Sequence, residues 1–583
     1  MTKILEIWPS NRGSVADSPL AGLAKLLGVN VCETAARQIP ESQDGFSNRG
    51  GRAVALTSET LQAAMKTGWF DDNWGTLDFV FVSGFSGQAG ETDALRQLTG
   101  GAISAAALLP KAEVTFAFFP TGIPAWPAAG LSYAAVADGF SVFDSNGSQA
   151  STTLATANGQ PFFVLVPRGQ TQIFLLTSEV SVDFAKPADR ELSVRELYPQ
   201  LVAGATFLRT AFGQSCWSAP VLPATVIIDD PYLAARYGFV RYRTLIERLQ
   251  ESRTALTVAF VPYNYRRSDP ATVSLLRNQL ERFSIAVHGC DHTAGEYASE
   301  DLAWLTATTS CAIERMERHE TRTGMPFDKV MIFPQGRFSL AALQALETCG
   351  LEAAVNSTLW PSDWRQAPLL LRELLDAAVT RYSDMPLFGR RYPRDAFDFA
   401  FDALFQKPLF VVEHHGYFRD GYESFQNFTR TISMLNPKVA WMSLGEAVRR
   451  FCLVRRTGAQ EIALRQFAPT LHWRNDSNAD VTVRVEKTQA RRPVTGVICN
   501  GTGVPFEINS GVLRFQVQIS AGEYLDALVE SPVHSVAARS VSFRSHVTTW
   551  GRRQLSDLRD NYIARSETAL ALAHAGKRLL SRH

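Results

Sequence analysis

Several features that would assign the sequence to a class at once are missing. Its seven cysteines include no Cys-x-x-Cys pair, so neither a zinc–thiolate site nor a disulfide framework is indicated. A formal net charge of +1 leaves no basic excess for general nucleic-acid binding. The start lacks a secretory signal, and three prolines interrupt the uncharged run at 114–137. We therefore expect a cytoplasmic protein with no transmembrane segment and no nucleic-acid partner.

The 583-residue chain is too long for one hydrophobic core and should divide into domains. Residues 1–205 alternate apolar runs with helix-like stretches, which predicts an α/β layer domain, similar to a degenerate flavodoxin-like or amidotransferase-like fold. Residues 456–540 alternate apolar and polar residues between turns, which predicts an antiparallel β-sandwich. A helical tail is expected at 541–583, either exposed for docking or lying on a membrane surface.

Residues 215–455 repeat one arrangement, in which a short apolar strand ends in polar or small residues and a helical stretch follows. The expected strands are 225–228, 256–261, 285–287, 330–333, 353–355 and 410–412. This repetition predicts a central parallel sheet or (β/α) barrel within an α/β multidomain protein. Because parallel strands end on the same face, the polar residues after them should converge on one site.

Carboxylate and imidazole side chains gather at three of these strand ends. They are Asp229 and Asp230 after the first strand, His288 and His292 after the third, and His414 and His415 after the last. Such groups bind divalent metals and move protons near neutral pH. An isolated Asp-Asp-Pro or His-x-x-x-His is more often structural, but the ordered combination at strand ends favours a metal site.

Local geometry should help to bring these groups together. If the turn after the third strand winds into a helix, His288 and His292 lie on one side of it. Pro231 biases Asp230 toward an extended backbone, which would hold the aspartate pair in place. The segment lacks the Glu of a His-Glu-x-x-His helix, so the zinc-protease class is disfavoured.

In order and spacing, these motifs resemble those of the polysaccharide deacetylase superfamily (carbohydrate esterase family 4 and its relatives), over about residues 220–450. The resemblance implies three roles: general base for Asp229, divalent-metal ligand for Asp230, His288 and His292, and general acid for His414 or His415. It also implies a bacterial-type hydrolase, with zinc or a similar ion, that removes acyl groups from a glycan or an activated sugar.

The sequence departs from this family in its third and fourth motifs. Ile332 stands where the family has an arginine, and Gln335 stands where it has an aromatic residue. The departure affects how Asp229 is oriented and how an oxyanion is held, although backbone N–H groups near Gln335 could hold one. The fourth motif survives only as Asp363 and Trp364, whose indole could form an apolar wall for the acyl methyl group. The match is to a divergent member.

Arg390 and Arg391 form a basic cluster that is either a solvated loop or a grip on an acidic or phosphorylated sugar. Two other functions stay open. A non-catalytic carbohydrate-binding or scaffolding protein could keep the barrel, and Ile332 favours that alternative. A glycosidase on a similar barrel would use two carboxylates instead of a metal. The sequence leaves the oligomeric state open.

Overall fold

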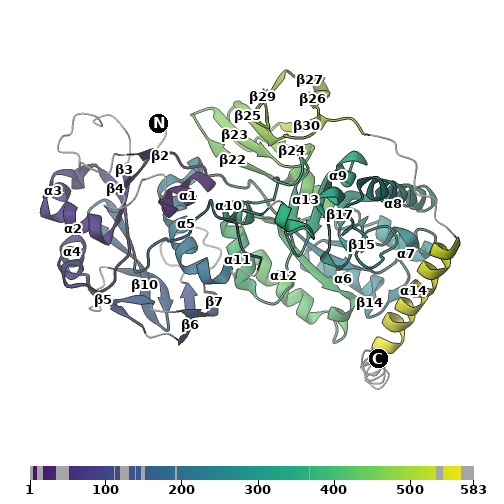
Figure 1. Cartoon of the computed structure of the whole chain (residues 1–583), viewed down its shortest axis with the longest axis horizontal. Helices are drawn as coiled ribbons and strands as arrows, with labels where there is room; N and C mark the ends of the chain where they lie inside the picture. The colour runs from purple at the N-terminus through teal and green to yellow at the C-terminus, as the bar shows by residue number, and fades with distance from the viewer. Residues whose placement is uncertain are drawn as a thin grey trace.

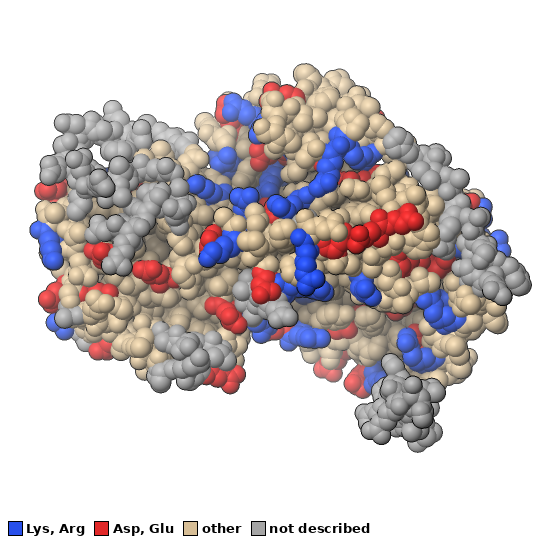
Figure 2. Space-filling view, in the orientation of Figure 1, with Lys and Arg blue, Asp and Glu red and all other residues tan. Residues whose placement is uncertain are grey.

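The computed structural model describes residues 4–8, 18–33, 52–109, 112–118, 130–137, 140–145, 151–190, 194–366, 368–533 and 543–565. Its N-terminal layers lie at one end of the molecule, and the central sheet lies at the other with the C-terminal sheets above it (Figure 1). Acidic and basic side chains are interspersed on the face shown in Figure 2, as the near-neutral net charge leads one to expect.

A mixed nine-stranded sheet forms the N-terminal part. Its order is β2 (Val31–Glu33), β1 (Leu5–Trp8), β3 (Arg52–Thr57), β4 (Leu77–Ser83), β11 (Thr171–Leu176), β10 (Gln160–Arg168), β9 (Thr152–Ala157), β6 (Ala112–Phe118) and β7 (Ser132–Ala137). The pairs from β2 to β11 are parallel, and the remaining pairs are antiparallel. β10 and β11 form an antiparallel hairpin around Arg168 and Gly169. The antiparallel half was not predicted.

Helices cover this sheet. They are α1 (Pro19–Leu26), α2 (Ser58–Lys66), α3 (Trp69–Asn73), α4 (Ala89–Thr99) and α5 (Tyr198–Phe212). The buried α5 packs its Phe207 ring against Phe81 of β4 and Phe174 of β11, so the helix is fixed to the parallel half of the sheet. Beside the main sheet, β5 (Ile103–Leu108) and β8 (Ser141–Ser145) form an antiparallel pair.

The central sheet is parallel throughout. Its order is β19 (Leu387–Gly389), β18 (Ala353–Asn356), β17 (Asp328–Ile332), β16 (Phe283–Val287), β15 (Leu256–Phe260), β12 (Leu222–Asp229) and β20 (Leu409–His414), with β21 (Val439–Trp441) also paired to β12. All six predicted strands are present. A parallel bridge between Arg391 and Val411 joins the segment after β19 to β20, so the two edges of the sheet meet there.

Apolar strands and amphipathic helices explain this arrangement. Every residue of β12 is buried, as expected for a parallel strand covered on both faces. The helices between the strands are α6 (Tyr242–Ser252), α7 (Pro270–Arg277), α8 (Leu302–Thr323), α9 (Leu340–Thr348), α10 (Leu371–Leu375), α11 (Ala396–Leu404), α12 (Glu423–Leu435) and α13 (Leu444–Arg450). Asp301 starts α8 by accepting the Trp304 N–H, and Gly324 ends it in a left-handed conformation.

Two further sheets follow the central one. The first has the order β22 (Cys452–Arg456), β23 (Glu461–Gln466), β25 (Val481–Thr488), β29 (Val512–Ile519) and β28 (Phe506–Asn509). The second has the order β24 (Thr470–Arg474), β30 (Tyr524–Glu530), β26 (Gly496–Cys499) and β27 (Thr502–Gly503). Their inward residues share one core, which includes Val483 and Phe515 from one sheet and Trp473 and Leu525 from the other. The expectation of wholly antiparallel pairing is wrong for β23 and β25, which run parallel.

The last described α-helix is α14 (Phe543–Asn561), which lies within the predicted C-terminal tail. In Figure 1 it lies along the outer edge of the central part, near α7 and β14 (Val240–Arg241). Residues 566–583 of the predicted tail lie outside the described residues. Within the described ranges, no helix combines the length and apolar character needed to cross a bilayer.

Candidate metal centre

The two adjacent aspartates end β12 in different conformations. Asp229 is the last residue of the strand, is 5% exposed, and pairs in register with His414 of β20. Asp230 follows with a φ of +85°. That left-handed region is uncommon for a residue other than glycine and costs on the order of 1–3 kcal/mol. The extended backbone predicted for Asp230 from Pro231 is therefore wrong, and the strained turn separates the two carboxylates.

A buried carboxylate shapes the loop that carries both histidines. His288 directly follows β16, and His292 lies four residues later with a φ of +56°. The chain between them is not helical, so the helical turn predicted there is wrong. Instead, the Glu296 carboxylate accepts the N–H groups of Cys290, Asp291 and His292 at 2.8–3.2 Å. One acceptor thus fixes the loop from inside and directs both imidazoles toward Asp230.

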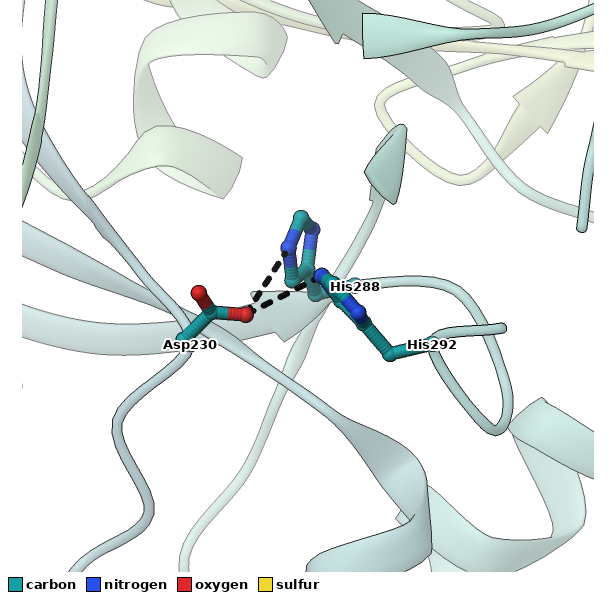
Figure 3. A group of neighbouring side chains, drawn as sticks. All are labelled: Asp230, His288 and His292. Carbon is teal, nitrogen blue, oxygen red and sulfur yellow. Dashed lines mark ion pairs between the residues drawn. The ribbon is translucent and has the colours of Figure 1, made fainter. Parts of the chain in front are cut away.

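Asp230, His288 and His292 converge on one point (Figure 3). Asp230 Oδ1 lies 3.0 Å from His292 Nε2 and 3.7 Å from His288 Nε2. The three potential ligand atoms lie within 4.8 Å of one another. These three residues, which the family resemblance marked as ligands, are therefore brought together.

The donor set fits a divalent metal ion. His288 Nδ1 lies 2.9 Å from the carbonyl oxygen of Ile332. Because a carbonyl only accepts, Nδ1 carries the proton and the Nε2 lone pair points to Asp230, as is usual for metal-binding histidines. Asp230 Oδ1 is buried and has no hydrogen-bond partner among the described residues, although both imidazoles are near it. A buried carboxylate oxygen without a donor is a poor arrangement unless a cation completes it.

The electrostatics of the cluster agree with metal binding. Burial lowers the pKa of His288 from its usual value to about 4, so its imidazole is neutral at pH 7. Burial alone would raise the pKa of Asp230, but the close imidazole of His292 and the electrostatic effects of His288 and Arg553 outweigh burial and lower the pKa below its usual value. A neutral imidazole and an ionised carboxylate are the forms in which these groups bind metals.

Asp229 is held by Arg390 and not by the metal cluster. Arg390 Nη1 and Nη2 donate to Asp229 Oδ1 and Oδ2 at 2.7 and 2.8 Å, and Arg390 is 4% exposed. Burial raises the pKa of Asp229, but the charges of Arg390 and His288 outweigh burial and leave the pKa below its usual value. The expectation of a solvated loop is wrong for Arg390, and its guanidinium faces Asp229 and not an incoming acidic sugar.

The neighbouring histidines His414 and His415 have different surroundings. His414 is exposed at the end of β20. Burial raises the pKa of Asp229, Arg390 opposes burial most strongly, and the charge of His414 lowers the pKa further. His415 Nε2 lies 3.5 Å from Asp560 Oδ1, and the His415 ring packs against Tyr237 and Phe239. Only His414 therefore combines solvent access with proximity to Asp229.

Four other predicted site residues serve local structure. Arg391 pairs with Asp402 at 2.5 and 2.9 Å. Gln335 has a φ of +57°, and its Oε1 accepts the Gly295 N–H at 3.2 Å. The remaining two are Asp363, which accepts the Leu340 N–H at the start of α9, and Trp364, which lies under the Arg365 guanidinium. In the described part of the chain, none of the four has a hydrogen bond or ion pair with Asp230, His288 or His292.

Helix α14 covers the carboxyl ends of the strands, which the sequence did not lead us to expect. Its contacts with loops after β12, β15, β16 and β20 are Tyr237–Asp560, Gly238–Asn561, Arg267–Asp557, Arg552–Asp291 and His415–Asp560. Arg553 is 4% exposed on the same side, and its charge reaches Asp230. The regular spacing of polar residues in this helix was the signal that could have indicated a buried polar face.

No protein-family profile and no curated protein matches the chain. Among solved structures, a polysaccharide deacetylase from Mycobacterium smegmatis is 14% identical, with 40% of this chain and 90% of that chain covered and a TM-score of 0.28. A family 4 carbohydrate esterase from Bacillus anthracis is 12% identical, with coverage of 40% and 84% and a TM-score of 0.25. A family 4 pseudoenzyme from the same organism is 11% identical, with coverage of 40% and 67% and a TM-score of 0.24. At these scores, the argument for function rests on the site alone.

Proposed function

We propose that this protein is a metal-dependent hydrolase that removes an N-acetyl or other acyl group from a carbohydrate. The observation that carries the proposal is a metal-ligand triad directly beside a second, separately held carboxylate. The triad is Asp230, His288 and His292, and the carboxylate is Asp229. We further propose that the chemistry belongs to residues 215–455, with 1–205, 456–540 and 541–583 as separate accessory parts.

In this proposal the triad holds one divalent ion, of which zinc suits two imidazoles and one carboxylate. When bound, such an ion lowers the pKa of water to about 7 and polarises a carbonyl group. The Ile332 carbonyl keeps His288 in the tautomer that presents Nε2, and Glu296 keeps the His292 backbone in its left-handed turn. Both contacts prepare the ligand set before any ion arrives.

The remaining residues move protons and hold each other in place. Asp229 accepts the proton of the attacking water, and its lowered pKa keeps it ionised for this role at neutral pH. Arg390 orients Asp229 through both carboxylate oxygens, which still keep lone pairs for the water. His414 donates a proton to the leaving nitrogen or oxygen, because it is exposed at the strand end next to Asp229. The products are a carboxylic acid, such as acetate, and the free amine or alcohol of the sugar.

The two alternatives fit the contacts less well. A glycosidase needs two free carboxylates on either side of a glycosidic bond. Here Asp229 is bound by a guanidinium on both oxygens, and Asp230 points into two imidazoles. A non-catalytic binding protein was favoured by the missing arginine at Ile332, but Arg390, which follows β19, supplies a cation that pairs with Asp229.

The test is acetate release from N-acetylated glucosamine oligosaccharides by the full chain, with and without a chelator. We expect release that chelation abolishes and added zinc restores. Asp229→Asn should lower the rate by at least about a hundredfold while metal content is unchanged. Asp420→Asn, which removes an exposed carboxylate in the loop after β20, is the matched control and should retain the wild-type rate. Release that survives chelation would sink the proposal.

A further inference from the structure

The polar residues of α14 are buried. Thr549, Arg553, Asp557 and Asp560 are each at most 7% exposed and recur at i, i+4, i+8 and i+11, which places them on one helix face. That face contacts the loops beside the candidate metal centre, through Asp560 with Tyr237 and Asp557 with Arg267. The usual orientation of an amphipathic surface helix, with its apolar face toward the protein, is therefore reversed.

The opposite side of α14 is apolar and exposed. Four large hydrophobic residues of the helix, Val547, Trp550, Leu555 and Leu558, are between 46% and 67% exposed, and Tyr562, which follows the last helix residue, is 69% exposed. Val547, Leu555 and Leu558 recur at i, i+8 and i+11 and so form one stripe along the helix; Tyr562 comes just after the helix end, and Trp550 lies at the edge of the stripe next to the buried face. These five are a third of the fifteen exposed large hydrophobic residues in the described part of the chain. So dense a cluster on one helix marks an interaction surface.

The residues of α14 beside the stripe include no acidic group. The helix contains only two acidic residues, Asp557 and Asp560, and both are on the buried face. The Arg559 side chain is 62% exposed beside the stripe, where its Nε pairs with Asp560, and the half-buried Arg552 donates to the Asp291 carbonyl. The sequence that follows, 566–583, adds Lys577, Arg578 and Arg582 against Glu567, together with four leucines. Among the described residues of α14, the outward side is therefore apolar, with Arg559 as its exposed cation and no acidic group of the helix itself.

We propose that the outer face of α14 docks on the surface of an anionic lipid bilayer. An apolar stripe with aromatic residues and flanking arginines is the pattern of a helix that lies in a membrane interface. A second copy of the chain fits less well, because a two-fold contact through this face would bring the same cations together. Since the inner face covers the strand ends, docking holds the candidate metal centre close to the lipid surface.

The experiment is sedimentation of the full chain with vesicles of phosphatidylcholine and phosphatidylglycerol. We expect the wild type to bind. The double variant Leu555→Glu/Leu558→Glu should bind at least about tenfold more weakly, because it removes two apolar contacts and adds repulsion. Gln554→Glu is the control for charge, since it places one negative charge on the exposed side of the same helix without removing an apolar group. The decrease in the logarithm of its vesicle affinity should be less than about a third of the decrease in the double variant.

Because both leucines are exposed, thermal unfolding of the double variant should match that of the wild type, which separates lost binding from lost folding. Wild-type protein that stays in the supernatant overturns the proposal, and so does vesicle binding that is equal in the double variant. Light scattering that detects a dimer broken by the double variant, without vesicle binding, assigns the face to a second copy and also overturns it. The readout is independent of metal chemistry, so failure here leaves the hydrolase proposal untouched.

Discussion

Arg390 and Asp229 form two parallel hydrogen bonds, although they are 161 residues apart in the chain. Arg390 follows the three-residue strand β19, and its own N–H is held by the carbonyl of Asn356 in β18. The guanidinium therefore comes from a fixed backbone at the point where the two edges of the central sheet meet. It provides the buried cation whose absence at Ile332 placed the orientation of Asp229 in question.

Replacing Arg390 should change the pH dependence of activity. Without the guanidinium, burial dominates and raises the pKa of Asp229, so a higher pH is needed to ionise the base. We expect the acid limb of the kcat/KM profile of Arg390→Lys to move upward, and that of Arg390→Gln to move further, by about 1–3 pH units. Arg391→Gln breaks the adjacent ion pair with Asp402 and is the control. Equal profiles for Arg390→Gln and Arg391→Gln would contradict the role of Arg390.

Glu296 should matter for metal affinity although it is no ligand. Its carboxylate accepts three N–H groups of the loop that carries His292, and an amide in its place loses one acceptor. Glu296→Gln should therefore weaken zinc binding by about 10–100-fold, as measured by competition with a chromogenic chelator. Glu300→Gln, which changes an exposed carboxylate close by, should leave the affinity unchanged. Wild-type affinity in Glu296→Gln would show that the loop holds its shape without this acceptor.

The two histidines after β20 should differ in their mutational effects. His414→Ala should lower kcat by about a hundredfold or more, with metal content and thermal unfolding retained, because an exposed acid is removed. His415→Ala should lower the unfolding temperature by several degrees, since it removes a half-buried ring and the partner of Asp560. The opposite outcome, with kcat lost only in His415→Ala, would reassign the general acid.

Metal-free protein should lose stability as the pH falls from about 6.5 to about 4. The folded protein binds a proton to His288 only near a pKa of about 4, whereas the unfolded chain binds it near 6.5. Protons thus favour the unfolded state in this window, by about 3 kcal/mol at its lower end. Buried His319, whose pKa is also lowered to about 4 by burial, contributes in the same direction.

Urea unfolding of His288→Gln and His319→Gln at several pH values tests this linkage. Each variant should show a weaker pH dependence than the wild type between pH 6.5 and 4. Only His288→Gln should also lose metal affinity, because His319 bonds to Ser268 and lies outside the triad. If neither variant changes the slope, the two imidazoles titrate normally in the folded protein.

The strands and the ligand triad were predictable because they depend on local patterns. Apolar runs such as the one ending at Asp229 are buried on both faces, and their polar ends meet by the geometry of parallel sheets. The family resemblance of the motifs then implied Asp230, His288 and His292 as ligands, and the structure brings these three residues together.

The supporting contacts depend on long-range packing and were therefore missed. The strand before Arg390 has only three residues, which is too few for a periodic signal. The hydrogen-bond partner of Arg390, Asp229, is remote in sequence. Glu296 reads as an ordinary surface acid until the loop closes around it. The preference for an extended residue before Pro231 was overridden at Asp230, whose left-handed turn is held by the surrounding packing.

Zinc titration of chelator-treated full chain, followed by calorimetry at pH 7.5, tests the central claim most directly. The triad predicts one equivalent of zinc bound tightly by the wild type and by Asp229→Asn, since Asp229 is engaged with Arg390 and not with the metal ligands. His292→Ala should weaken the binding by at least about a hundredfold, because one of three ligands is gone. No saturable zinc binding by the wild type, or equal affinity in His292→Ala, would contradict a metal centre at Asp230, His288 and His292.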